Sequence, residues 1–173
     1  IGKSLALYPT PLVVVGAMID KKPNYLLVGH LGIMGHDHVM ISLASNHYTN
    51  RGIKENRALT INLVDRSMLK KADYVGSVSG YKSNVFQYHI GITRTPIIDE
   101  SPVVMECTVD DIYETSGFEN YICKITAVHA EDNILNETGK LDYSLLKPVL
   151  FEMPTYQYLL TGNVIGQCLK LEK

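Results

Sequence analysis

The sequence predicts a mainly β domain, a closed antiparallel barrel with a few short helices attached. At least six segments have the length and β-branched content of strands, whereas only two or three short segments have helical spacing. The strand segments follow one another directly instead of alternating with helices, and this order favours antiparallel pairing. The sequence contains no internal repeat, linker or low-complexity tract, so residues 1–173 are predicted to form a single domain.

A β-hairpin is predicted near the start of the chain. Tyr8-Pro-Thr-Pro11 is not helical, because each proline biases the residue before it toward extended structure. The apolar runs 12–19 and 25–32 then flank turn residues at 20–24, which is the pattern of a hairpin. Glycine interrupts the second run from position 29 onward. This predicts a bulge, or a place where something flat approaches the backbone.

Residues 39–63 contain the most informative turn. An apolar strand, Val39–Leu43, is followed by a polar turn at 45–49, a short helix and a second strand, Leu59–Leu63. Hydroxyl, amide and imidazole side chains fill the turn, and Arg51 lies just beyond it. This composition suits a phosphate, because the N–H groups and the dipole at a helix N-terminus favour an anion. The alternative is that these residues only cap the helix.

The second half of the chain is predicted to add a helix and a long antiparallel pair. Residues 67–74 have helical spacing with Ser67 as the cap, and a small polar surface loop follows at 76–84. The β-rich runs 103–109 and 121–128 form the two arms of the pair. These segments complete an order of neighbouring strands rather than strand–helix–strand units.

Composition excludes several classes of protein. A net charge of −2 and a pI near 6.3 leave no basic excess to neutralise a nucleic-acid backbone. No apolar run approaches the roughly 18 residues of a membrane span, and no basic segment precedes the first apolar run as in a signal peptide. Cys107, Cys123 and Cys168 are far apart and predict free thiols in a reducing compartment. We therefore expect a soluble cytoplasmic protein that binds neither nucleic acid nor membrane.

The conventional catalytic motifs GxSxG, GxxxxGK[ST], HExxH and GxGxxG do not occur in the sequence. His36-Asp37-His38 invites a metal site. Successive side chains of a strand point to opposite faces, however, so a polar surface turn is the better interpretation. Asp110, Asp111 and Glu114 lie at the end of a strand and are explained by a solvated edge.

A combination of features is more informative than any single motif. It consists of the glycine-interrupted strand, the polar turn, Asn62 inside an apolar strand, and the loop that carries Lys82. A buried amide needs partners or costs about 1–3 kcal/mol, so Asn62 either anchors neighbouring backbone or contacts a ligand. Together these features can supply a phosphate pocket, backbone N–H groups for a flat heterocycle and a nearby cation.

The order of the segments resembles the flavin reductase-like family, specifically its flavoredoxin branch. The resemblance extends over nearly the whole chain. The matching pieces are, in order, Tyr8–Val15, Lys22–Tyr25, Val39–Leu43, Tyr48-Thr49 with Ile53–Asn56, Leu59–Leu63, Ala72–Gly76, Ser79-Gly80 with Lys82, Pro102–Cys107 and Tyr158–Gly162.

The resemblance implies a Greek-key-like antiparallel split barrel that binds FMN. The flavin would lie against residues 25–33 and its phosphate at the turn 45–49, with further contacts from Asn62 and the loop 79–82. The family is usually homodimeric, and the flavin lies near the interface, where Tyr156 or Tyr158 of the tail approaches. The implied cofactor-binding residues are Val28, Gly29, His30, Leu31, Gly32, Ser42, Leu43, Ala44, Ser45, Asn46, Tyr48, Thr49, Asn62, Ser79 and Lys82.

The implied function is hydride or electron transfer carried by the flavin itself. No catalytic side chain is assigned, because the protein's part is binding, orientation and electrostatic tuning of the ring. The donor would be NAD(P)H in a flavin reductase, or a redox protein in a flavoredoxin-type carrier, and no motif distinguishes the two. The alternative is a non-catalytic module that binds a flavin, or a metal through His30, His36, His38 and His47.

Overall fold

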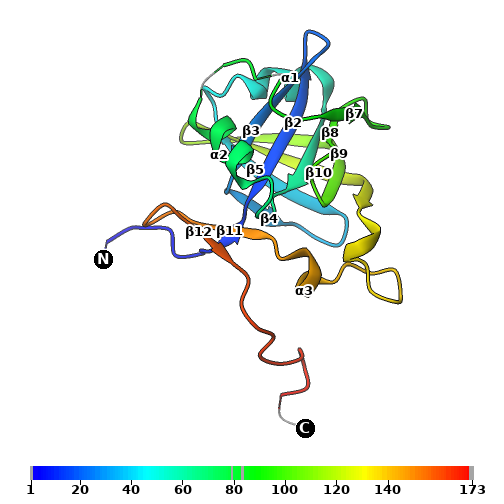
Figure 1. Ribbon diagram of the computed structural model, residues 1–173. Coiled ribbons are helices and arrows are strands. Elements are labelled where there is room, and N and C mark those ends of the chain that lie inside the picture. Colours follow the sequence, from blue (N-terminus) through cyan, green and yellow to red (C-terminus); the bar gives the residue numbers. More distant parts are fainter. Residues whose placement is uncertain (1, 79, 83, 172–173) are drawn as a thin grey trace.

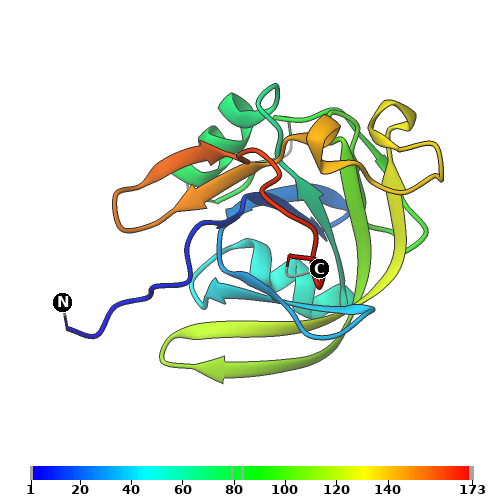
Figure 2. The same cartoon turned by 90° about the horizontal axis from the view of Figure 1, so that it is seen from below.

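The computed structural model describes residues 2–78, 80–82 and 84–171, and a curled seven-stranded antiparallel sheet forms its centre (Figures 1 and 2). The predicted mainly β architecture with short helices is confirmed. In spatial order the strands are β3 (Lys22–Val28), β2 (Val13–Ile19), β6 (Ala58–Leu63), β9 (Val103–Thr115), β10 (Phe118–Ala130), β5 (His38–Ala44) and β4 (Leu31–Ile33).

The sheet stops short of a closed barrel. Its two edge strands, β3 and β4, are consecutive in the chain but lie at opposite ends of the strand order. The expectation of a closed barrel from strand counting is therefore wrong, whereas the split barrel implied by the family resemblance is confirmed. The break falls at Gly29, whose carbonyl accepts a hydrogen bond from the Thr10 hydroxyl at 2.7 Å. A Cβ on Gly29 would lie 2.6 Å from Cδ1 of Phe151, so this ring packs directly on the backbone at the break.

Short elements cover the sheet. Helix α2 (Leu69–Ser77) packs against β3, and α1 (Thr49–Asn56) packs against β2 (Figure 1). The predicted Ser67 cap is replaced by Asp65, whose carboxylate accepts from the Met68 N–H at 3.0 Å. The remaining elements are β1 (Thr10–Pro11), β7 (Tyr88–Ile90), β8 (Pro96–Ile98), a 3₁₀ turn (Asp132–Ile134), α3 (Tyr143–Leu146), β11 (Val149–Glu152) and β12 (Gln157–Leu160).

Two apolar clusters hold the fold together. The larger one lies within the curl and contains Val15, Ile41 and Leu59, and the smaller one lies beneath α2 around Tyr25 and Val75. Both faces of β3 are thus covered, which explains its nearly continuous burial. In β5 the buried residues alternate with half-buried ones, so alternate side chains leave the core and face the split edge.

Tight turns set the strand register. Asp20 and Lys21 both have positive φ, 49° and 64°, and form a two-residue turn that matches the twist of a hairpin. The predicted five-residue turn is therefore too long, and Asn24 lies inside β3, opposite Ala17. Pro23 is tolerated there because β3 is an edge strand. The long pair is confirmed and extends further than predicted, to 13 residues in each of β9 and β10.

Both ends of the described chain run outside the sheet as extended segments (Figures 1 and 2). They carry apolar side chains in solvent: Leu7 is 84% exposed and Ile165 is 99% exposed. Cys107 and Cys123 are buried free thiols, and Cys168 is exposed in the tail. Among the described residues, no helix is both long and apolar enough to cross a membrane.

Candidate functional site

Two adjoining cavities open at the split edge of the barrel, with volumes of about 470 Å³ and about 250 Å³. Gly29, His30 and Ser42 line both of them. The predicted site residues that line one or both cavities are Val28, Gly29, His30, Leu31, Ser42, Leu43 and Ala44. The strand break and the neighbouring end of β5 thus lie together at these cavities.

The alternation of β5 explains why these side chains meet. Ile41 and Leu43 are buried in the core, whereas Ser42 and Ala44 are half-buried on the other face. The Ser42 N–H donates to the carbonyl of His30 at 2.9 Å, which ties β5 to the break. Gly32, which is also a predicted site residue, lies in β4 and contributes to neither lining, and a Cβ there would meet open space.

Aromatic and sulfur side chains frame the cavities. Nε2 of His30 lies 2.8 Å from the hydroxyl of Tyr8, which also contacts Sδ of Met153 at 3.1 Å. The ring centroids of His30 and Phe118 are 6.1 Å apart, in an edge-to-face arrangement. Burial, and then the nearby Tyr156, raise the pKa of Tyr8, so its hydroxyl is protonated at neutral pH. The result is a largely apolar slot, and its volume is in the range of small-molecule sites.

A third cavity, of about 320 Å³, shares Gly29 with the other two and is lined by both tail tyrosines. The hydroxyl of Tyr158 donates to Asp73 at 2.5 Å, whereas Tyr156 is 74% exposed. Burial, followed by the bond to Asp73, raises the pKa of Tyr158 to about 12. The two tyrosines therefore differ: Tyr158 is fixed to α2, and Tyr156 presents its ring to solvent.

The polar turn leads from the cavities to the start of α1. Ser45, Asn46 and Tyr48 are exposed, and Thr49 is buried as the first helical residue. Tyr48 occupies the N-cap position, and its side chain makes no capping hydrogen bond. At the N-cap position, therefore, no side chain of the polar turn caps the helix. The positive end of the helix dipole faces the turn.

Lys82 is a cation linked to this turn, because its backbone N–H and the Thr49 hydroxyl are both bonded to Asn24. Its side chain is largely buried, with 7% of the residue exposed, and Nζ donates to the carbonyl of Tyr25 at 3.3 Å. In the described part of the chain the ion-paired lysines are Lys54 and Lys71, and Lys82 is not among them. Burial lowers the pKa of Lys82. Burial, and then the charge of Lys82, also lower the pKa of His47, which lines the second cavity.

Two further residues were named in the sequence analysis, Ser79 and Arg51. Ser79 falls outside the described residues. Arg51, which the sequence offered as a further cation, forms ion pairs with Asp20 and Glu55, each at 2.8 Å, and these two carboxylates offset its charge.

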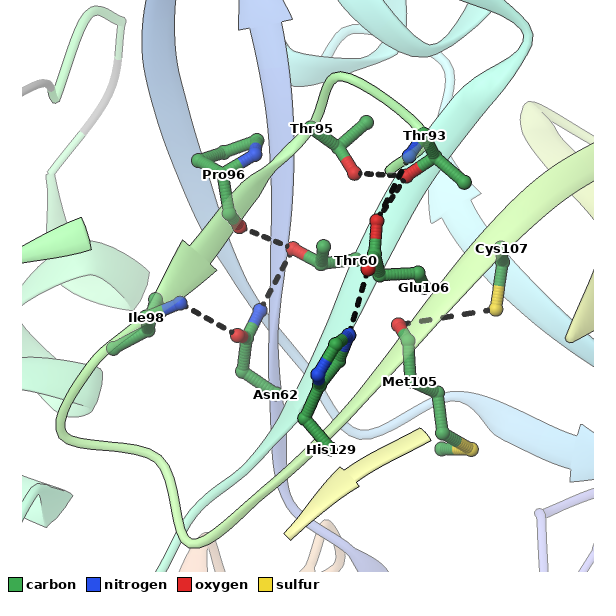
Figure 3. Close-up of polar contacts among 10 residues, drawn as sticks. All are labelled: Thr60, Asn62, Thr93, Thr95, Pro96, Ile98, Met105, Glu106, Cys107 and His129. Atoms are coloured by element: carbon green, nitrogen blue, oxygen red, sulfur yellow. Dashed lines mark hydrogen bonds and ion pairs between the residues drawn. The ribbon is translucent and has the colours of Figure 1, made fainter. Parts of the chain in front are cut away.

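Asn62 belongs to a separate buried network on the sheet (Figure 3). Its Nδ2 donates to the Val14 carbonyl and to the Thr60 hydroxyl, each at 2.9 Å, and its Oδ1 accepts from the Ile98 N–H at 3.1 Å. It lines none of the three cavities described above. Of the two roles that the sequence left open, the observed one is to anchor β8 to the sheet.

Next to Asn62, a buried carboxylate holds the turn that closes the β7–β8 hairpin (Figure 3). Glu106 is fully buried and accepts from the Thr93 N–H at 2.9 Å, the Thr93 hydroxyl at 2.8 Å and Nε2 of His129 at 2.7 Å. Burial would raise the pKa of Glu106, but these hydrogen bonds outweigh it and lower the pKa below its ordinary value. This cluster is a structural clamp.

The histidines are not gathered into a metal centre. In the described ranges, no group of three or more His, Cys, Asp or Glu side chains is placed to hold a metal ion. His38 bonds to Asp37 at 2.7 Å and to Asp110 at 3.0 Å, which joins β5 to β9. His36 is exposed, in keeping with a polar surface turn.

Sequence reasoning missed several residues that line or support these cavities, among them Tyr8, Phe118, Phe151 and Asn24. Tyr8, Phe118 and Phe151 come from segments far apart in the chain and meet only through strand register. Asn24 is fully buried between Thr49 and Lys82. A signal for it was present, since an amide within a strand-like run needs partners, but turn composition assigned it to the hairpin loop.

Comparisons with known proteins agree with this geometry. The profile of the family described as "Flavin reductase like domain" matches residues 5–158. Flavoredoxin from Methanosarcina acetivorans is 30% identical, with a TM-score of 0.95 over 100% of this chain and 96% of that chain. Flavoredoxin of Desulfovibrio vulgaris (Miyazaki F) is 27% identical, with a TM-score of 0.92 over 100% and 98%.

More distant structures share the fold alone. An FMN-binding protein from Thermus thermophilus is 16% identical, with a TM-score of 0.80 over 92% of this chain and 90% of that chain. A comparison with curated protein sequences gave no match.

Proposed function

The chain belongs to the flavin reductase-like domain family, and from this premise we propose that it is an FMN-binding oxidoreductase. Its chemistry is either that of an NAD(P)H-dependent flavin reductase or that of a flavoredoxin-type electron carrier. The likeness to two flavoredoxins over the full length of this chain supports the second form. The flavin, when bound, supplies the redox chemistry, and the protein binds, orients and shields it.

One observation carries the proposal: the apolar cavities at the barrel edge lie close, through His47, to a buried lysine that has no carboxylate partner in the described chain. His47 connects the two, because it lines the second cavity and feels the charge of Lys82. FMN has this same polarity, with a flat ring at one end and a phosphate at the other. We assign the ring to the slot at Gly29, and the phosphate to Thr49 and Lys82.

The residues at the slot have identifiable parts in this proposal. The backbone at Gly29 gives a ring room to approach, and the Tyr8 hydroxyl fixes His30 beside it. Met40 and Phe118 exclude water from the wider cavity. Exclusion of water strengthens every electrostatic interaction with the ring, which is how a site without an acid–base residue still tunes a flavin.

A second copy of the chain completes the proposed site. Leu5 and Leu7 line the wider cavity and are still 60% and 84% exposed, so the apolar wall on this side is unfinished. Val164 and Ile165 of the tail are equally uncovered, at 87% and 99% exposed. Exposed apolar arms of this kind are typical of surfaces that another chain buries. We expect a homodimer by analytical ultracentrifugation, and a Leu7→Asp variant with weaker self-association.

The experiment that tests the function is a spectrum of the purified protein followed by anaerobic reduction. We expect a yellow protein that releases FMN on denaturation. Bleaching by NADH or NADPH within seconds supports a reductase, and bleaching only by dithionite or a protein donor supports a carrier. A colourless protein that takes up no FMN in a titration contradicts the proposal.

A further inference from the structure

A buried amide links the two sides of the proposed phosphate site. Asn24 is fully buried in β3. Its Nδ2 donates to Oγ1 of Thr49 at 2.8 Å, and its Oδ1 accepts from the backbone N–H of Lys82 at 2.7 Å. One side chain therefore fixes both the first residue of α1 and the loop that carries the buried cation.

The chemistry of the partners determines which way the amide faces. A backbone N–H only donates, so the atom of Asn24 that faces Lys82 is the carbonyl oxygen. The NH₂ group must then face Thr49. Since this NH₂ donates to the Thr49 hydroxyl, the hydroxyl acts as acceptor and its single hydrogen is left to donate in another direction.

This polarity places two side-chain donors beside the turn. The Thr49 hydroxyl hydrogen and the Lys82 ammonium are both donors, and both lie in largely buried residues, whereas the N–H groups of Asn50 and Arg51 already donate to the carbonyls of His47 and Tyr48. A cluster of donors that includes a buried cation selects an anion over a neutral group. A neutral hydroxyl can also accept from these donors, but it offers no negative charge to the Lys82 ammonium.

We propose that Asn24 is the positioning residue that makes this site select a flavin bearing a phosphate over riboflavin. It does so by holding Thr49 in the donor state and Lys82 beside it. The inference rests on the proposed function, and it adds to that function a residue and a reason for discrimination between two ligands with the same ring. Asn24 itself touches neither the phosphate nor the ring.

The most informative variant is Asn24→Asp. Aspartate is nearly the same size and still accepts from the Lys82 N–H, but its second oxygen accepts the Thr49 hydrogen and turns it away from the phosphate. The variant also places a negative charge behind the site. Both hydrogen bonds in the flavin-free protein survive but the buried carboxylate costs stability, so a merely structural role predicts a lower melting temperature and the same effect on the affinity for both flavins. A positioning role predicts that FMN affinity falls at least about 100-fold while riboflavin affinity stays within about threefold.

Two further variants separate positioning from folding. In Asn24→Ala both partners lose the amide, and we expect an intermediate loss of FMN preference of about tenfold. Asn62→Ala is the matched control, because Asn62 is equally buried but lies in the other network. It should lower the melting temperature without changing the ratio of FMN to riboflavin affinity. Should Asn24→Asp not fold, Thr49→Val removes the same donor and Thr49→Ser restores it.

The readout is the dissociation constant of FMN and of riboflavin for flavin-free wild type and variants, together with their melting temperatures. Wild type that prefers FMN and an Asn24→Asp variant that loses this preference support the inference. If wild type prefers FMN and Asn24→Asp keeps the preference, the inference is overturned and the proposed function stands. Wild type that binds neither flavin overturns the proposed function, and the inference with it.

Discussion

Replacing Lys82 by methionine tests the phosphate end of the site most simply. Methionine keeps most of the length and volume of the side chain and removes its charge. A hydrogen bond to a charged group contributes about 1.5–3 kcal/mol, so FMN affinity should fall by roughly ten- to a hundredfold. Riboflavin lacks the phosphate, so the affinity of the variant for riboflavin should equal that of wild type.

The same change should not weaken the flavin-free fold. Lys82 is 7% exposed, and in the described chain its ammonium has a single neutral acceptor, the Tyr25 carbonyl. A buried charge of this kind costs stability, which is also why burial lowers the pKa of this lysine. We therefore expect the melting temperature of flavin-free Lys82→Met to stay level or rise.

Fluorescence titration of flavin-free protein with FMN and with riboflavin gives both constants, and Lys70→Met, at an exposed position of α2, is the control. An equal loss of affinity for FMN and riboflavin would refute the assignment of Lys82 to the phosphate, since it would point to general damage. A change in FMN affinity of less than about twofold would refute it as well.

Other changes test the turn and the clamps. A double Asn46→Ala, Thr49→Ala variant should lose FMN faster during dialysis, and unchanged retention would remove the turn from the site. Glu106→Gln should lower the free energy of unfolding at pH 7 by about 1–3 kcal/mol, as measured by urea denaturation. The pKa of Glu106 is lowered in the folded protein, so its contribution to stability is present above the unfolded value of 4.5 and is lost as the pH falls through the folded pKa. The stabilities of wild type and Glu106→Gln should therefore converge in acid. Hydrogen bonds to Asp110 and then to Asp37 raise the pKa of His38. The contribution of His38 to stability is therefore full below 6.5 and is lost as the pH rises through the folded pKa. An NMR titration of His38 should give a raised midpoint, and Asp110→Asn should bring that midpoint back toward 6.5.

The strands were predictable from short runs of apolar and β-branched residues, whether one face is buried, as in β5, or both, as in β6. In β5 the buried Val39, Ile41 and Leu43 alternate with half-buried residues. Successive side chains of a strand point to opposite faces, and this alternation decides which side chains face the core and which face the site. Ser42, Leu43 and Ala44 were expected at the site from the family resemblance, and not from this alternation.

The walls of the slot were not predictable in the same way. Phe118 and Phe151 reach it from β10 and β11, and Tyr8 from the segment just before β1; their meeting depends on register and on the break at Gly29. Local patterns carry no information about which distant strand ends come together. The prediction of a closed barrel was wrong for the same reason, because a count of strands does not show where the edges of the sheet lie.

Polar residues inside strands show that turn-like composition alone does not locate a turn. Proline and asparagine at 23 and 24 have turn composition, yet the two-residue turn at Asp20 and Lys21 places Asn24 within β3. Asn62 was correctly recognised as a buried amide, but only the register of β8 shows that its partners are backbone and Thr60. The same residue type thus serves the proposed site at one position and the scaffold at the other.

Titration of flavin-free wild-type protein with FMN and riboflavin tests the central claim most directly. The account predicts that both ligands bind in the slot and that FMN binds at least about tenfold more tightly, because only FMN reaches Lys82 and Thr49. Equal affinities would contradict the phosphate end of the site. The absence of binding by either flavin would contradict the account as a whole.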